Sequence, residues 1–204
     1  MRIGILGSGA VGQSLARGLA RHGHETRIGT RQAAVAELPV GSPAEVAAEA
    51  ELVVLGVQGA AAEELARSLA DELDGKVLVD ATNPLEFSSG GPQLFVGHTD
   101  SLGERVQRAA PGARVVKAYN TVGNPLFVDP QLPGGPPTMF IGGNDAAAKA
   151  TVTELLTSTG WDVADLGGIE ASRYLEPMCM AWVAYGGQVR DWGHAFRLLR
   201  PQAR

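Results

Sequence analysis

The sequence predicts an α/β fold built on a doubly wound, mostly parallel sheet of the Rossmann type. Short runs rich in Val, Ile and Leu alternate with alanine-rich runs of helical periodicity. The run LVVL at 52–55 shows almost no polar alternation, as a strand buried on both faces requires. A glycine-rich segment at 7–12 joins the first strand-like run directly to the first helical run, a connection typical of this fold.

The first half of the chain supplies most of the predicted sheet. The predicted strands, in chain order, are 2–6, 24–28, 38–40, 51–57 and 76–80. The predicted helices are 10–21, 42–50 and 60–72. Ser42 and Pro43 suit the N-cap and the first helical position of the second helix. The strand at 38–40 is weak, and we expect it at an edge of the sheet.

The second half continues the alternation and ends in a long apolar stretch. Further strands are predicted at 113–118, 138–142 and 161–166, and helices at 101–109, 145–158 and 171–199. We expect Asp100 to cap the first of these helices. In the last helix, helical spacing predicts one buried face, formed by Leu175, Met178, Cys179, Trp182 and Tyr185. We therefore divide the chain into a nucleotide-type domain at 1–170 and a C-terminal helical segment at 171–204.

Composition excludes several classes of function. The chain has 204 residues and a net charge of −5, with 17 Lys and Arg against 22 Asp and Glu, which disfavours a nucleic-acid partner. The single cysteine excludes an intrachain disulfide and the usual thiolate zinc site. No apolar run approaches the roughly 20 residues of a membrane span. We expect a cytoplasmic protein with no metal and no membrane partner.

The glycine-rich segment predicts a dinucleotide site. Six successive residues match the pattern G-x-G-x-x-G, namely Gly7, Ser8, Gly9, Ala10, Val11 and Gly12. In this pattern the first glycine permits a tight turn, the second lets the backbone approach a pyrophosphate, and the third lets helix and strand pack closely. The start of the following helix offers free N–H groups to the anion. The alternative is a glycine-rich turn that binds nothing.

The end of the second predicted strand indicates which dinucleotide binds. An NAD site usually carries Asp or Glu here, which hydrogen-bonds the ribose 2′-hydroxyl. This sequence has Thr30 and Arg31 instead, and no carboxylate. A hydroxyl and a guanidinium suit a 2′-phosphate, which a carboxylate would repel. We therefore predict NADP(H) rather than NAD(H); the alternative is that Arg31 is an ordinary surface charge.

Several segments together resemble one family. The N-terminal stretch MRIGILGSGAVGQSLARGLARHGHETRIGTR is followed by LVVLGV, KVLVDATNPL, RVVKAYNTVG and IGGND. Over about residues 1–185 this series resembles the F420-dependent NADP oxidoreductases. The resemblance implies a Rossmann domain with a small C-terminal part, hydride transfer between NADPH and the deazaflavin coenzyme F420, and a 2′-phosphate contact from Thr30 and Arg31. Archaeal members often carry a further basic residue after that pair, where this sequence has Gln32.

The ligand of an open parallel sheet lies beyond the carboxyl ends of its strands. Residues predicted at those ends, besides the glycine segment, are Val57, Gln58, Asn83, Pro84 and Asn120. Either asparagine could orient the nicotinamide or the acceptor, and either could equally serve its loop, because Asn favours turns. We predict no catalytic side chain, since hydride transfer between bound partners depends mainly on positioning. Lys117, inside an apolar run, is more easily explained by a salt bridge than by contact with the acceptor.

Three functions remain open. The first is hydride transfer between NADP(H) and F420; the acidic tail of F420 would need cations, for which Arg173 and Arg190 are candidates. The second is NADPH-dependent reduction of another small acceptor, such as a flavin, an imine or a ketone. The third is a redox sensor that binds NADP(H) without catalysis. The aromatic residues of the C-terminal segment also predict a homodimer.

Overall fold

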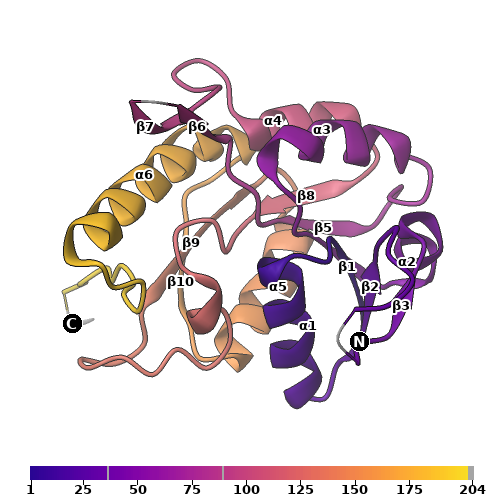
Figure 1. The fold of residues 1–204 in the computed structure, drawn as a ribbon, viewed down its shortest axis with the longest axis horizontal. Coiled ribbons are helices and arrows are strands. Elements are labelled where there is room, and N and C mark those ends of the chain that lie inside the picture. Colours follow the sequence, from indigo (N-terminus) through magenta and orange to yellow (C-terminus); the bar gives the residue numbers. More distant parts are fainter. Residues whose placement is uncertain (36, 89, 202–204) are drawn as a thin grey trace.

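The protein is described by a computed structural model that covers residues 1–35, 37–88 and 90–201. Eight strands form one sheet in the order β10-β9-β8-β5-β4-β1-β2-β3, and two more form a separate hairpin (Figure 1). All neighbours in the large sheet run parallel except β8 and β9. The order reverses between β1 and β4, and this switch point is where a doubly wound sheet binds its ligand.

The elements lie close to their predicted positions through most of the chain. The strands are β1 (Arg2–Leu6), β2 (Glu25–Gly29), β3 (Val40–Gly41), β4 (Leu52–Leu55), β5 (Val77–Asp80), β6 (Leu85–Ser88), β7 (Gly91–Leu94), β8 (Arg114–Lys117), β9 (Thr138–Gly143) and β10 (Asp162–Asp165). The helices are α1 (Ala10–Arg21), α2 (Pro43–Glu49), α3 (Gly59–Ser68), α4 (Leu102–Ala109), α5 (Ala146–Ser158) and α6 (Ser172–Val189). Two short 3-10 turns lie at Asn124–Leu126 and Ile169–Ala171.

Helices cover both faces of the sheet, which explains the continuous apolar strands. On one face α1 and α5 pack with Val54, Val79 and Val116. On the other face α2, α3 and α4 pack with strand residues of the opposite parity, such as Leu78 and Val115. Successive residues of one strand thus enter different cores. The doubly wound α/β fold is confirmed.

The N-termini of the helices show why they begin where they do. Ser42 caps α2 in a capping box with Glu45, and Pro43 opens the helix, both as predicted. The prediction for α4 was wrong by one residue, because Ser101, not Asp100, accepts the N–H of Glu104. Asp100 instead binds the guanidinium groups of Arg105 and Arg108.

Three features differ from the prediction. The β6–β7 hairpin occupies a stretch for which no element was predicted, and it lies near α6 (Figure 1). Strand β9 runs antiparallel to β8, so the sheet is mixed at this end. The last helix ends at Val189 rather than residue 199, because Arg190 adopts a left-handed conformation with φ 56°. The chain then turns back, and the N–H of Thr138 in β9 donates to the carbonyl of Phe196.

Candidate functional site

The glycine loop has the geometry that its sequence pattern requires. Gly7 has φ +127°, which L side chains rarely adopt, and it lies against the backbone of Gly56 at the end of β4. A Cβ on Gly12 would collide with the carbonyl oxygen of Gly7, whereas a Cβ on Gly9 would meet nothing within 4 Å. Gly9 is also exposed and stands at the N-cap of α1, with no side chain capping the helix. The space above this helix terminus can accept an anion.

The residues predicted for the 2′-phosphate lie beside this loop. The Thr30 hydroxyl donates to the Ser8 hydroxyl at 3.1 Å, which joins the end of β2 to the glycine loop. Thr30 is fixed further because its Oγ1 accepts the N–H of Gln32 at 3.1 Å. The adjacent Arg31 is exposed. The structure therefore brings two hydroxyls and a cation to the side of the loop where β2 ends.

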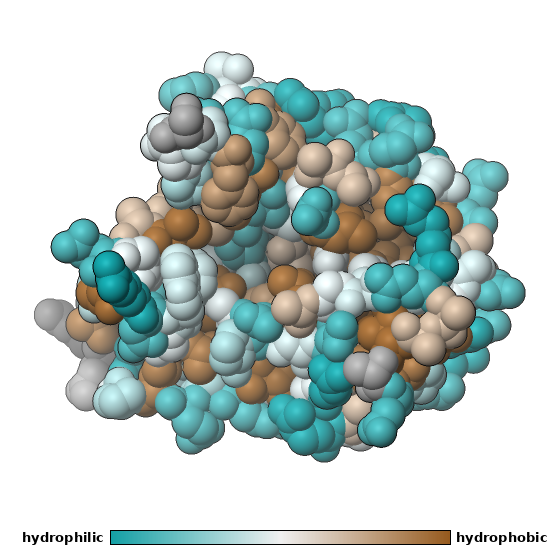
Figure 2. Space-filling view, viewed as in Figure 1, coloured by the Kyte–Doolittle hydropathy of each residue, from teal (hydrophilic) through white to brown (hydrophobic). Residues whose placement is uncertain are grey.

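The end of β4 borders the same loop. Val57 is half-buried, and its side chain lies near Gly7. Gln58 is the N-cap of α3 but makes no side-chain capping bond, and it is exposed. The predicted residues of β1, β2 and β4 thus meet at one edge of the sheet. Figure 2 shows a hollow in this face of the molecule, between the region of α6 and the region where α1 begins.

The two asparagines pair with each other, and they differ in burial. Asn83 donates to the carbonyl of Asn120 at 2.8 Å, and Asn120 donates to Asn83 Oδ1 at 3.1 Å. Asn83 is half-buried, whereas Asn120 is only 3% exposed, and Pro84 is buried. A Cβ on Gly59 would collide with the carbonyl oxygen of Asn83, so the start of α3 fixes Asn83 from the other side. Asn83 is therefore the member of the pair that a ligand can reach.

Beneath the asparagines lies a cluster of buried charges. Lys117, at the end of β8, bonds Asp80 of β5 at 2.9 Å and Glu176 of α6 at 2.9 Å. Each of the three side chains is at most 1% exposed. Burial alone would lower the pKa of Lys117, but the two carboxylates outweigh burial and raise that pKa above its ordinary value. The salt bridge predicted for Lys117 is confirmed.

Sequence reasoning missed four residues of this region, namely Gly59, Asp80, Thr82 and Glu176. Thr82 donates from its N–H and its hydroxyl to Asp80, which shapes the turn that leads to Asn83. Glu176 carried a signal, because a glutamate inside an apolar helical run must find a partner. Gly59 carried none, because its constraint comes from a contact distant in the sequence.

Several polar groups and one loop outside these strand ends have other environments. His98 is an exposed loop residue with φ 61°. Cys179 is buried in α6, and burial raises the pKa of its thiol to about 11. Arg173, considered for an acidic tail, holds both oxygens of Glu104 through two nitrogens, whereas Arg190 is exposed. The loop at 129–137 begins near His22, at the far end of α1 from the glycine loop.

Within 1–35, 37–88 and 90–201, no group of three or more His, Cys, Asp or Glu residues is arranged to hold a metal ion. Over the same ranges, no helix combines the length and the apolar character needed to cross a membrane.

Comparisons with known proteins agree with this geometry. The family model "NADP oxidoreductase coenzyme F420-dependent" matches residues 2–84, from β1 to the turn that carries Asn83 and Pro84. The F420-dependent NADP reductase of Methanothermobacter marburgensis is 31% identical over 200 residues, covering 86% of this chain and 88% of that protein. The chain belongs to the F420-dependent NADP oxidoreductase family. It is thus an NADP-dependent oxidoreductase.

Two further proteins are similar to this chain. A crystal structure from Arthrobacter sp. FB24, provisionally described as an F420-dependent NADP reductase, superposes with a TM-score of 0.92 at 42% identity. The match covers 98% of this chain and all of that one. The rat metalloreductase STEAP3 is 31% identical over 189 residues, 86% of this chain. The chain spans only 36% of the length of STEAP3.

Proposed function

We propose that this enzyme transfers a hydride between NADP(H) and coenzyme F420. One observation carries the proposal: relatives named as F420-dependent NADP reductases match almost end to end. The protein of Methanocaldococcus jannaschii, at 26% identity, covers 97% of this chain and 98% of its own length. The similarity therefore includes the C-terminal segment as well as the nucleotide-binding part.

On the NADP side, the proposal assigns one role to each part of the site. The residues that hold the pyrophosphate are Gly7, Ser8, Gly9, Ala10, Val11 and Gly12. Thr30 and Arg31 hold the 2′-phosphate, and Val57 and Gln58 flank the cofactor where β4 ends. Open space over Gly9 and exposure of Arg31 support this assignment. Bound NADPH supplies the hydride, and the protein orients it and excludes water.

At the nicotinamide end, we assign contact to Asn83 and support to Asn120 and Pro84. Asn83 is half-buried and is held by Asn120 on one side and by Gly59 on the other. Asn120 is too deeply buried to touch a ligand unless the chain moves. No side chain is assigned as a catalytic acid or base, because positioning accounts for most of the acceleration in such a transfer.

The test mixes the protein with NADPH and oxidised F420 and follows both absorbance bands. We expect loss of the F420 band in step with NADPH oxidation. Arg31→Ala should raise the KM for NADPH about 10- to 150-fold, because a charge-assisted bond to phosphate contributes about 1.5–3 kcal/mol. Arg21→Ala, at the exposed far end of α1, is the matched control and should leave that KM unchanged.

A second candidate function is reduction of another acceptor by NADPH. The similarity to rat STEAP3, a metalloreductase, favours this alternative. The second proposal would replace the first if F420 is not reduced but free flavin, an imine or a ketone oxidises NADPH. Tight NADPH binding without turnover of any acceptor would instead indicate a redox sensor.

The remaining proposals concern organisation. We propose that residues 1–170 bind NADP(H) and that residues 171–204 provide the acceptor side and a homodimer contact. The exposed Arg190 is then the cation offered to an acidic tail. A cytoplasmic location is also proposed, on the sequence alone. Exposed Tyr174 and Tyr185 on α6 support the homodimer contact.

A further inference from the structure

The C-terminal helix is attached to the sheet by buried charge at the point where the strands end. We propose that Glu176 is a positioning residue for hydride transfer, because it fixes α6 relative to the strand ends that carry Asn83 and Asn120. This inference rests on the proposed function, since α6 is there assigned to the acceptor side. Glu176 itself touches neither cofactor nor acceptor and acts through its partners.

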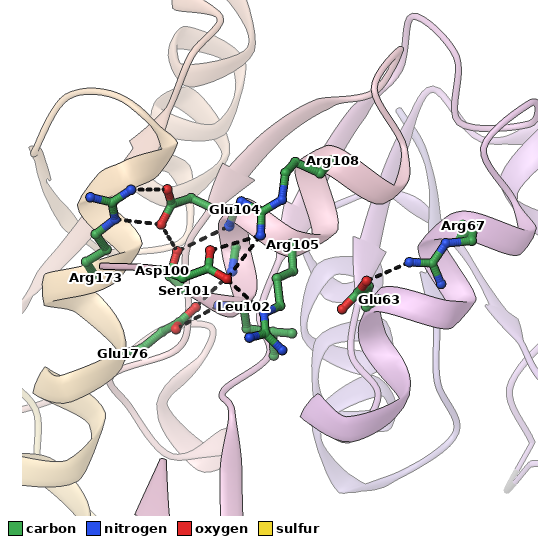
Figure 3. Close-up of polar contacts among 11 residues, drawn as sticks. Glu63, Arg67, Asp100, Ser101, Leu102, Glu104, Arg105, Arg108, Arg173 and Glu176 are labelled. Carbon is green, nitrogen blue, oxygen red and sulfur yellow. Dashed lines mark hydrogen bonds and ion pairs between the residues drawn. The ribbon is translucent and has the colours of Figure 1, made fainter. Parts of the chain in front are cut away.

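Glu176 joins three elements at once. One oxygen meets Lys117 of β8 at 2.9 Å and also accepts the N–H of Gly103 at 2.9 Å. The other oxygen accepts the N–H of Leu102 at 3.0 Å (Figure 3). Leu102 and Gly103 are the first residues of α4, whose positive end favours a carboxylate. The carboxylate is therefore satisfied in only one placement of α6.

Contact between α4 and α6 is unusually close here. A Cβ on Gly103 would collide with the hydroxyl of Ser172, which lies one turn before Glu176 in α6. On the outer side, Arg173 donates hydrogen bonds to both carboxylate oxygens of Glu104 of α4 (Figure 3). Side chains from adjacent turns of α6 thus hold the same end of α4. Movement of α6 along its axis would break all of these contacts together.

The same turn of α6 also reaches the asparagine pair. Asn120 donates to the carbonyl of Leu175 at 2.8 Å, and Leu175 directly precedes Glu176. Asp80, the other partner of Lys117, shapes the turn before Asn83 through its bonds to Thr82. Two consecutive residues of α6 are therefore connected to both asparagines, one through hydrogen bonds and one through buried charge.

Stability alone does not explain such a cluster. Desolvation offsets much of the attraction in a buried ion pair, so apolar residues of similar volume are often as stabilising. Charged groups differ from apolar ones because they have strict distances and directions. A hydride donor and acceptor need such precision, since a displacement of about 1 Å can cost a hundredfold in rate. We infer that the cluster holds α6 in a defined position relative to the strand ends.

The test uses Glu176→Gln in the full-length protein. We expect the Kd for NADPH, from nicotinamide fluorescence, to stay within about twofold, because the glycine loop is untouched. The single-turnover rate of NADPH oxidation by F420 should fall at least tenfold. The primary deuterium isotope effect with NADPH labelled at C4 should rise, which a general loss of folded protein would not cause. Glu63→Gln, which breaks the exposed pair with Arg67, is the matched control (Figure 3).

A second variant covers the case in which Glu176→Gln does not fold. The triple variant Asp80→Asn, Lys117→Met and Glu176→Gln removes all three charges together, so none is left unpaired. We expect it to bind NADPH and to transfer hydride slowly. A wild-type rate in either folded variant would overturn the inference, as would failure of both to fold. If the wild type does not reduce F420, the proposed acceptor is wrong, and the comparison is made with an acceptor that it does reduce.

Discussion

Two glycines of the same loop are constrained by different partners. Gly12 is required by the protein itself, because any side chain there meets the backbone of Gly7. Gly9 has open space, and its φ of −74° suits any residue, so the fold does not require glycine at this position. If the pyrophosphate occupies that space, Gly9 is required by the ligand. Substitution by alanine separates the two requirements.

We expect Gly9→Ala to melt within a few degrees of the wild type and to bind NADPH at least tenfold more weakly. Gly12→Ala should lose stability by about 1–3 kcal/mol or more, the usual cost of overpacking. Thermal melting with and without NADPH measures both effects. Wild-type NADPH affinity in Gly9→Ala would contradict the assignment of this loop to the pyrophosphate.

At this scale, the sequence predicted the residues whose constraint is local. Neighbours within a few positions explain the glycine loop and the Ser42 cap. The chemistry of a single side chain explains why the buried Lys117 needs an ion-pair partner. The identity of the partners of Lys117 does not follow in this way, because Asp80 lies 37 residues and Glu176 59 residues away in the chain. The burial of Asn120 likewise depends on α6, which only the folded structure brings against it.

Elements were predictable where a buried face set their periodicity. The parallel strands are flanked by helices on both faces and read as continuous apolar runs. The β6–β7 hairpin lacks this signal because it has only two strands and is largely exposed, with Phe87 at 79%. The end of the last helix was not predictable for a related reason: apolar residues continue to 199, but Trp192 and His194 pack on Trp182 across a chain reversal rather than along one helix.

The ion pair between Glu104 of α4 and Arg173 of α6 is a pH-dependent contact. Hydrogen bonds from Arg173 hold the pKa of Glu104 below its ordinary 4.5. A carboxyl with a lowered folded-state pKa contributes stability that is present above the unfolded pKa and is lost as the pH falls through the folded pKa. The contribution of this pair should therefore be complete at neutral pH and should disappear below pH 4.5.

Chemical denaturation of Glu104→Gln should show this window. At pH 7 we expect the variant to be less stable by about 1 kcal/mol, since the pair is partly exposed. As the pH falls below 4.5, the difference from the wild type should shrink. Glu154→Gln, at an exposed position of α5, should follow the wild type at every pH. A constant difference down to pH 3 would show that the Glu104 carboxylate is not the group that titrates.

At the scale of the whole molecule, one surface of α6 is largely exposed, although the ring of Tyr185 packs edge-on against His194 with the ring centroids 4.8 Å apart. Tyr174 and Tyr185 are 69% and 57% exposed, and a separation of eleven residues places them on one face of a helix. Met178 and Ala181 lie between them on the same face. The predicted buried face was therefore wrong at two positions, because Tyr185 is exposed and Met178 is only half-buried. The buried members of that predicted face are Leu175, Cys179 and Trp182. A second copy of the chain would cover this face symmetrically.

We expect a homodimer at micromolar concentration, with a mass near twice the 21.2 kDa of one chain. Lysine at both tyrosine positions, Tyr174→Lys and Tyr185→Lys, should yield a folded monomer, because two buried charges would face their symmetry copies. Leu166→Lys, at an apolar residue 43% exposed beyond β10, should remain dimeric. Sedimentation velocity distinguishes the outcomes. A monomeric wild type would show that α6 meets solvent or the acceptor directly, and hydride transfer would then be complete within one chain.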